Sequence, residues 1–343
     1  MARLKRIAKW AALPAFYLLL LVLFIRLTFP YEAIGNRLVS EFNAQQPSLG
    51  EATKRLEIGE VSGYWFFGIE VENLRYISEA PTTDKEAKPS VLEVEHAFAS
   101  ISPLRALFGT IHVDFGAEVD AGEISGTYSS NDELAELALE LADVDVSRVA
   151  PLRDLVELPI TGTLSGEVDL SMPERQLKLA NGSVDLTIEG LTLGDGKAKI
   201  RETIALPKMQ AGSLRLEAKS SEGSLEIKEF SAKGKDFELV SQGGLRLRDP
   251  FEQSLADVDL RFKFTDAYRN KNDLTRGIFG APGSKVPALF ELDPQIKRSK
   301  GADGFYGWKL SGPIGRLNFR PSPRGGVDNN RRGSGHANRS PKR

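Results

Sequence analysis

The side chains that could carry out catalysis or bind a metal are few in this chain. It has no cysteine and three histidines, His96, His112 and His336, which stand far apart in the sequence. A thiolate nucleophile, a disulfide and a cysteine zinc site are therefore excluded, and no His-x-His or His-Glu-x-x-His spacing occurs. His96 shares a strand face with apolar residues, which favours an interior histidine over a ligand. The sequence predicts no catalytic residue, no cofactor and no metal site, and therefore a protein that is not an enzyme.

Two glycine-containing segments also suggest ligand sites. Gly194 and Gly196 flank a single aspartate, which supplies too few oxygen ligands for calcium, so a plain turn is the better interpretation. Gly277, Gly280 and Gly283 have the even spacing of a phosphate loop, but no Lys-Ser/Thr pair ends the segment and no apolar strand runs into it. Neither segment is predicted to be a ligand site.

The N-terminus has the composition of a membrane anchor. A basic head over residues 1–9 precedes an apolar run, and Trp10 and Tyr31 bracket this run as interfacial aromatics. We predict an uncleaved transmembrane signal anchor over residues 10–29, because about 20 apolar residues in a helix cross the ~30 Å bilayer core. The basic head is expected to stay in the cytoplasm, which places the rest of the chain outside. A cleaved signal peptide is the alternative, but residues 26–32 lack the small residues that cleavage needs.

Most of the chain beyond the anchor alternates apolar and polar residues with period two. The alternation is clear in residues 92–98, 111–121 and 257–264. It indicates strands with one apolar and one polar face. Short glycine-containing turns leave no room for crossover helices, which predicts an antiparallel meander. We therefore expect a mainly β fold, with β regions over residues 30–129 and 159–320.

A helical insert is predicted between these two β regions, over residues 130–158. Ser130 or Asn131 is suited to cap a helix whose first turn is acidic. Leucines follow at positions 134, 137, 139 and 141, and a second short helical pattern begins at Ser147. At the other end of the chain, residues 321–343 are rich in Gly, Pro, Arg, Asn and Ser, which predicts a disordered basic tail.

The apolar positions of the later strands are predicted to share one continuous face. Its candidate lining is Val168, Leu170, Val184, Leu186, Ile188, Leu214, Leu216, Val258, Leu260, Phe262 and Phe264. Phe230 is out of step with Leu225 and Ile227, which predicts a β-bulge near Lys228 and Glu229. Left open, this face forms a groove for acyl chains, and closed on itself it forms an ordinary core. The sequence leaves both interpretations open.

Two further segments are candidates for contact with a membrane or a partner. Tyr64, Trp65, Phe66 and Phe67 form an aromatic cluster soon after the anchor, and the alternative is a packed strand end. Residues 266–273 mix both charges, which predicts a solvated loop or a docking epitope. The formal net charge of −2 gives no reason to expect nucleic acid as a partner.

The order of these segments resembles the long form of the type II secretion system protein N family. The resemblance lies in residues 158–170, 190–196, 261–268, 289–294 and 304–308, which describe strands and turns. It implies a structural component of the type II protein secretion system, anchored in the cell inner membrane by a single pass. Its C-terminal domain would lie in the periplasm, with other secretion components as partners.

A wider similarity is to AsmA-like envelope proteins. It lies in residues 56–74 and 310–321. It implies a large, curved antiparallel β-sheet with an apolar groove. The alternative function that follows is binding or transport of phospholipid in the cell envelope.

Overall fold

The structure is a computed structural model, and it describes most of the chain. The described residues are 12–13, 16–17, 20–21, 23–24, 26–44, 53–79, 90–148, 159–196, 199–200, 204–205, 207–283 and 288–323. They fall into two compact units, with residues 1–131 and 148–150 in the first and residues 132–147 and 151–343 in the second.

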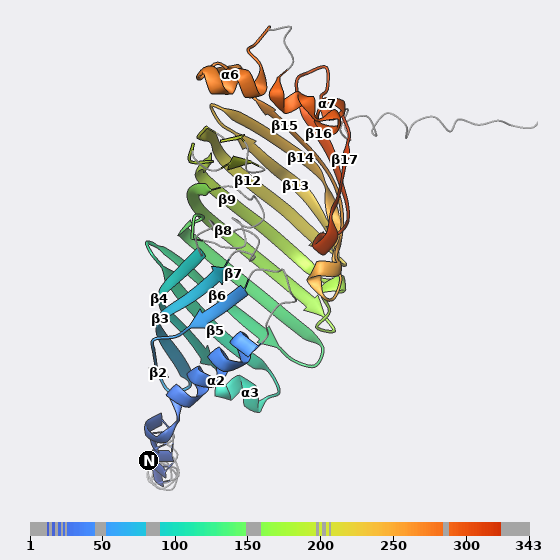
Figure 1. Cartoon of the computed structure of the whole chain (residues 1–343). Helices are drawn as coiled ribbons and strands as arrows, with labels where there is room; N and C mark the ends of the chain where they lie inside the picture. Colours follow the sequence, from blue (N-terminus) through green and yellow to red (C-terminus); the bar gives the residue numbers. More distant parts are fainter. Residues whose placement is uncertain are drawn as a thin grey trace, which may run out of the picture. The chain divides into compact units, whose positions relative to one another are not determined.

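The first unit is an antiparallel sheet with helices α2 and α3, preceded by helical residues between 12 and 28 (Figure 1). Its elements are α2 (Tyr31–Ala44), β1 (Thr53–Glu57), β2 (Glu60–Tyr64), β3 (Gly68–Glu79), β4 (Ser90–Ile101), α3 (Pro103–Leu107), β5 (Ile111–Val119) and β6 (Gly122–Ser130). The strand order is β1-β3-β4-β5-β6, and β2 pairs with β3. Helix α2 packs closely on β2, because a Cβ added at Gly35 would lie 2.5 Å from the side chain of Val61.

The second unit is a longer antiparallel meander. Its strands are β7 (Leu134–Asp145), β8 (Ile160–Pro173), β9 (Asn181–Leu193), β10 (Lys199–Ile200), β11 (Ile204–Ala205), β12 (Met209–Ser221), β13 (Ser224–Lys233), β14 (Phe237–Arg246), β15 (Leu255–Phe264), β16 (Tyr306–Pro313) and β17 (Asn318–Pro321). The order is β7-β8-β9-β12-β13-β14-β15-β16-β17, and β10 pairs separately with β11. The predicted mainly β, antiparallel fold is confirmed.

Short helices lie between the strands of this second unit. They are η1 (Leu177–Leu179), η2 (Phe251–Gln253), α5 (Asp266–Arg269), α6 (Asp273–Phe279), η3 (Leu289–Leu292), α7 (Pro294–Ser299) and η4 (Ile314–Arg316). The loop predicted over residues 266–273 is wrong in conformation, because α5 and the start of α6 occupy it, although most of these residues are exposed. The side chains of Thr265 and Asn272 cap these two helices. Both capping residues lie in a polar segment, and the polar composition led to the prediction of a loop.

The helical insert predicted over residues 130–158 is wrong in its described part. Leu134–Asp145 is strand β7, which pairs residue by residue with β8. Leucine, alanine and glutamate favour helices intrinsically, but such preferences of less than about 1 kcal/mol per residue yield to strand pairing and burial. Residues 149–158, which hold most of the second helical pattern, lie outside the described residues.

The described residues contain no helix with the length and hydropathy required for a membrane crossing. The anchor predicted over residues 10–29 includes several positions outside the described part of the chain, so it stays a prediction. Most of the predicted tail, residues 324–343, also lies outside it.

An aromatic cluster closes one end of the second unit, where α6 and α7 lie in Figure 1. The ring centroid of Phe264 on β15 lies 4.2 Å from that of Phe279 and 5.5 Å from that of Phe290. Tyr268 is fully buried beside them, and its hydroxyl donates a 2.6 Å hydrogen bond to the carbonyl of Pro207. The helices thus bury the strand ends under a packed core.

The tight turn between β12 and β13 offers a test of the close backbone approach at Gly223. Gly223 has φ +72°, and a Cβ there would lie 1.9 Å from the carbonyl oxygen of Lys178. We expect Gly223→Ala to lower the free energy of unfolding by roughly 3 kcal/mol, because backbone strain and overpacking add. Gly190→Ala is the matched control, since φ is +64° there but nothing lies within 4 Å. It should cost only about 1 kcal/mol in denaturant melts, and equal costs would contradict the close approach.

Candidate functional site

The pairing register of the second unit places the predicted lining residues on one face. Directly opposed residues of antiparallel strands point to the same side of a sheet. Val168 on β8 opposes Val184 on β9, and Val184 opposes Ala218 on β12. The same row continues across the later strands through Ile227, Gly243, Val258, Leu310 and Phe319.

A second apolar row runs beside the first, two residues along each strand except β13, where the bulge makes it three. It begins at Leu141 and Gly166, and it continues through Leu186, Leu216, Phe230, Ser241, Leu260 and Trp308. Seven of the eleven predicted lining residues belong to these two rows or flank them, and we call this surface the apolar face. They are Val168, Leu170, Val184, Leu186, Leu216, Val258 and Leu260.

The other four predicted lining residues belong to the closed end. Ile188, Leu214, Phe262 and Phe264 pack against the buried cluster that contains Tyr268 and Phe279. They share the face but serve as ordinary core. The strand register therefore agrees with the predicted continuous apolar surface. The helices at the closed end cover part of that surface.

The degree of burial separates an open face from a sealed core. Of the eleven predicted residues only Val258 is buried, at 8% exposure, and the other ten are half-buried. Val144 and Val146, by contrast, are 1% and 0% exposed. Half-burial is expected when side chains cover one another from the sides without a facing layer. The apolar face is therefore only partly withdrawn from water.

The predicted bulge is confirmed, and it extends the apolar face. Glu217 on β12 opposes Glu229, but the next residue, Ala218, opposes Ile227, which leaves Lys228 as the extra residue. Because one residue is skipped, Phe230 and Ile227 point to the same side. Without the bulge, Phe230 would point into the charged face.

Sequence reasoning missed the contribution of β7 and β16. Leu137 and Leu139 oppose Leu170 and Val168, so β7 lengthens the apolar face by one strand. Trp308 opposes Leu260 at the other side. The signal for β7 was present, because the leucines at 137, 139 and 141 keep period two, but their neighbours are strong helix formers.

The opposite face of the second unit is charged. Arg215 on β12 lies 3.2 Å from Asp185, 3.5 Å from Glu217 and 3.8 Å from Glu229. These exposed pairs add little stability, but they mark this side as the one that faces water. The second unit is therefore amphipathic across the thickness of its sheet.

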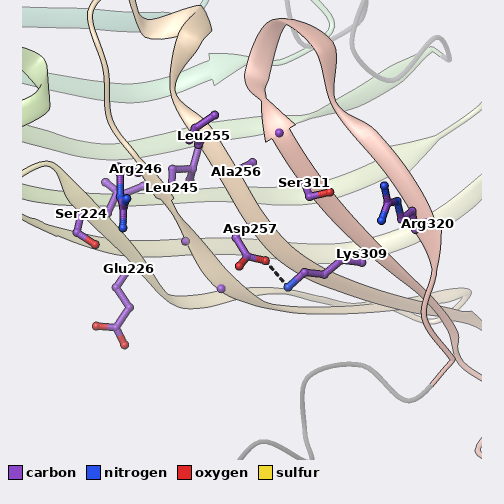
Figure 2. Close-up of a pocket in the computed structure, with 14 residues that line it drawn as sticks. Ser224, Glu226, Leu245, Arg246, Leu255, Ala256, Asp257, Lys309, Ser311 and Arg320 are labelled. Atoms are coloured by element: carbon purple, nitrogen blue, oxygen red, sulfur yellow. Dashed lines mark ion pairs between the residues drawn. The ribbon is translucent and has the colours of Figure 1, made fainter.

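A shallow hollow of about 750 Å³ lies over β13–β17, where Gly243 and Gly244 lack side chains (Figure 2). Its labelled side chains carry both charges, and Lys309 forms ion pairs with Asp257 and Asp259. These three groups pair with one another, and the hollow has the character of an uneven charged surface.

The other sequence candidates do not form a catalytic or metal site. The described residues hold no group of three or more metal-ligating side chains. His96 lies with its Nε2 atom 2.5 Å from Glu70, a local pair on neighbouring strands. Gly277 lies inside α6 and Gly280 ends it, which excludes a phosphate loop there. Gly194 and Gly196, with φ +75° and +80°, form the turn that the sequence predicted.

A polar contact fastens the helical end to the sheet. Glu291 on η3 accepts a 2.5 Å hydrogen bond from Lys300 and a 2.8 Å one from the Tyr306 hydroxyl on β16. Burial alone would raise the pKa of Glu291, but these hydrogen bonds outweigh it and hold the pKa below its ordinary value. Burial, together with the carboxylate, raises the pKa of Tyr306, which therefore remains a donor.

Comparison with protein-family models, with curated proteins and with solved structures gave no match for this chain. Its function must therefore be argued from the apolar face itself. The resemblance to secretion and AsmA-like proteins remains a prediction.

The Glu291 contact predicts a pH dependence of stability. A carboxyl group whose folded pKa is lowered stabilises the protein above its ordinary pKa, and this contribution disappears as the pH falls through the folded value. We expect Glu291→Gln to cost roughly 1 to 2 kcal/mol at pH 7 and progressively less below about pH 4. Thermal melts against pH measure this difference. Glu252→Gln on exposed η2 is the control, and a gap that stays constant with pH would argue against the contact.

Proposed function

We propose that this chain is a membrane-anchored envelope protein whose second unit binds acyl chains of phospholipids on its apolar face. The observation that carries the proposal is the continuity of two apolar rows across the strands from β7 to β16, combined with half-burial. Apolar surface of this extent on a water-exposed sheet is unfavourable unless a ligand or partner covers it.

The dimensions of the apolar face suit acyl chains. The order β7-β8-β9-β12-β13-β14-β15-β16-β17 contains eight gaps between strands, which at about 4.8 Å each span roughly 38 Å. A bilayer core of about 30 Å is two acyl chains deep, so one chain extends about 15 Å. Two chains therefore fit end to end along the rows. About a dozen methylenes at about 0.8 kcal/mol each would contribute on the order of 10 kcal/mol before the cost of association.

The N-terminal residues support the anchor part of the proposal. The described residues between 12 and 28 are helical, and the large apolar side chains among them are exposed, from 41% for Leu20 to 76% for Leu27. A helix with apolar side chains exposed on all sides is typical of a membrane span. Together with the basic head, this favours a single pass in the inner membrane and a periplasmic body.

A role in type II protein secretion is the second candidate. It rests on the resemblance and on exposed leucines of the helical end, namely Leu274 at 48%, Leu289 at 52% and Leu292 at 66%. Exposed leucines grouped on short helices are typical of protein contact surfaces. Other secretion components would dock there, and the protein would act as a scaffold.

Lipid binding can be tested with two neighbouring substitutions on β9. Leu186 lies in an apolar row, whereas Thr187 points to the charged face and opposes Arg215. We expect phospholipid to copurify with the wild-type chain and with Thr187→Glu, and to be reduced at least about tenfold in Leu186→Glu, because a carboxylate on the apolar face repels acyl chains. Mass spectrometry of extracted lipid measures the ratio, and circular dichroism checks that all three chains are folded.

Two results would count against lipid binding. One is a wild-type chain that purifies free of phospholipid. The other is an equal loss in the Leu186→Glu and Thr187→Glu variants, which would show that the apolar face is not the binding surface.

The secretion role has a separate test. Deleting the gene and assaying secreted proteins should show a loss of secretion that the wild-type gene restores. Leu292→Asp should restore it less well if the helical end is the docking surface, because a charge there disrupts an apolar contact. Unchanged secretion after deletion would remove this candidate.

A further inference from the structure

We propose that one end of the first unit lies against the membrane, with the β2–β3 turn and α3 inserting apolar side chains among the lipid headgroups and upper acyl chains. We call Trp65, Phe66, Phe67, Leu104, Leu107 and Phe108 the membrane-facing patch. The inference rests on the anchor in the proposed function, and it adds a second point of contact that is independent of the lipid-binding face.

The aromatic cluster of the sequence divides into a packed residue and an exposed turn. Tyr64 stacks on Phe98, with ring centroids 4.5 Å apart, so it belongs to the sheet. Trp65, Phe66 and Phe67 form the turn between β2 and β3 and are 69%, 54% and 46% exposed. These three consecutive aromatic side chains do not stabilise the fold, because their apolar surface stays exposed to water.

Helix α3 presents a second apolar group at the same end. Leu104, Leu107 and Phe108 are 70%, 78% and 81% exposed. The two groups are joined through the backbone, because the amide of Ile101, at the end of β4, donates a 3.0 Å hydrogen bond to the carbonyl of Phe67. Helix α3 starts two residues later, at Pro103.

The direction of α2 shows that this end is the one nearest the anchor. Asn43, near its C-terminus, hydrogen-bonds to the backbone of Leu56 on β1, four residues before β2 begins. At its N-terminus, the ring of Tyr31 lies 2.8 Å from where a Cβ at Gly63 would be, near the end of β2. Helix α2 therefore runs antiparallel to β2, and the β2–β3 turn extends beyond the N-terminus of α2 toward the residues that precede it.

The residues before α2 touch the turn directly. The guanidinium carbon of Arg26 lies 5.9 Å from the ring centroid of Phe66. Arg26 is three residues before Phe29, where the predicted span ends, and this corresponds to about 4.5 Å along a helix. The turn thus lies level with the last turn of the predicted span. Arginine and tryptophan are the side chains that favour this depth of a membrane.

The charges around the membrane-facing patch agree with a lipid surface. Helix α3 carries one charged residue, Arg105, whose guanidinium lies 2.7 Å from Nδ1 of His112. At the turn, the guanidinium group of Arg26 contacts the ring of Phe66. Both are cations, which attract anionic headgroups, whereas the patch itself is apolar. A lipid surface is favoured over a protein partner because the patch continues into the exposed apolar helix.

Fluorescence of Trp65 tests the proposal in the full chain. Trp10 and Trp308 are replaced by phenylalanine, and the protein is reconstituted into phosphatidylcholine–phosphatidylglycerol vesicles with or without bromine on the upper acyl carbons. We expect bromination to lower the Trp65 emission roughly twofold, because interfacial side chains lie about 5–10 Å into the headgroup and acyl boundary. Leu107→Asp should weaken the quenching, and its 78% exposure makes unfolding an improbable cause.

A matched control uses the far end of β3, the strand that follows the turn. Arg75 lies on β3 eight residues beyond Phe67, about 26 Å away along the strand. Arg75→Trp, in a chain that also carries Trp65→Phe and the two other tryptophan replacements, should show no quenching by brominated lipid. Quenching of Trp65 alone supports the proposal, and equal quenching of both tryptophans overturns it.

Vesicle flotation separates this proposal from the anchor. Protein that floats with the vesicles while Trp65 is not quenched would overturn the membrane-facing patch and leave the anchor intact, so a protein partner would then be the occupant. Protein that fails to float would overturn both the anchor and the patch. Neither result bears on phospholipid copurification, which tests the apolar face of the second unit.

Discussion

Hydrogen-bonded register between neighbouring strands decides which side chains of the second unit meet water. Each strand alternates its side chains, so a slip of β12 by one residue against β9 would put Glu217 in place of Leu216 opposite Leu186. The apolar face exists because this register is kept from β7 to β16. A bulge at Lys228 restores the phase of Phe230 on β13, and the glycines in the rows allow the strands to approach closely. Cross-strand apolar pairs and backbone hydrogen bonds therefore support each other.

The same register creates the functional problem that the protein must solve. A sheet with one charged and one apolar face normally buries the apolar face against a second layer. Here the helices α5, α6 and η3 cover only the end where Phe264, Tyr268 and Phe279 meet. Most residues of the rows beyond that end remain half-buried. A ligand that is long, flexible and apolar satisfies this surface without needing a precise shape, which is why an acyl chain is a better candidate than a compact polar substrate.

Two apolar surfaces of different form occur in the chain. The apolar face of the second unit is long and belongs to regular strands, whereas the membrane-facing patch is small and belongs to a turn and a short helix. Flat strand surfaces suit a ligand that lies along them, and protruding tips suit insertion into a boundary between water and lipid.

The sequence by itself determined which residues belong together on each strand. Period-two alternation placed all eleven proposed lining residues in phase within their strands, and the misfit of Phe230 located the bulge. The sequence pattern failed to predict β7, because its Leu, Ala and Glu residues favour a helix locally. It also failed to predict α5 and α6, because their caps at Thr265 and Asn272 lie in a polar segment. Only the tertiary structure decided that Trp65 points outward while Tyr64 packs, and that the apolar face is partly open. Alternation is a property of one strand, whereas burial depends on what other parts of the chain place against it.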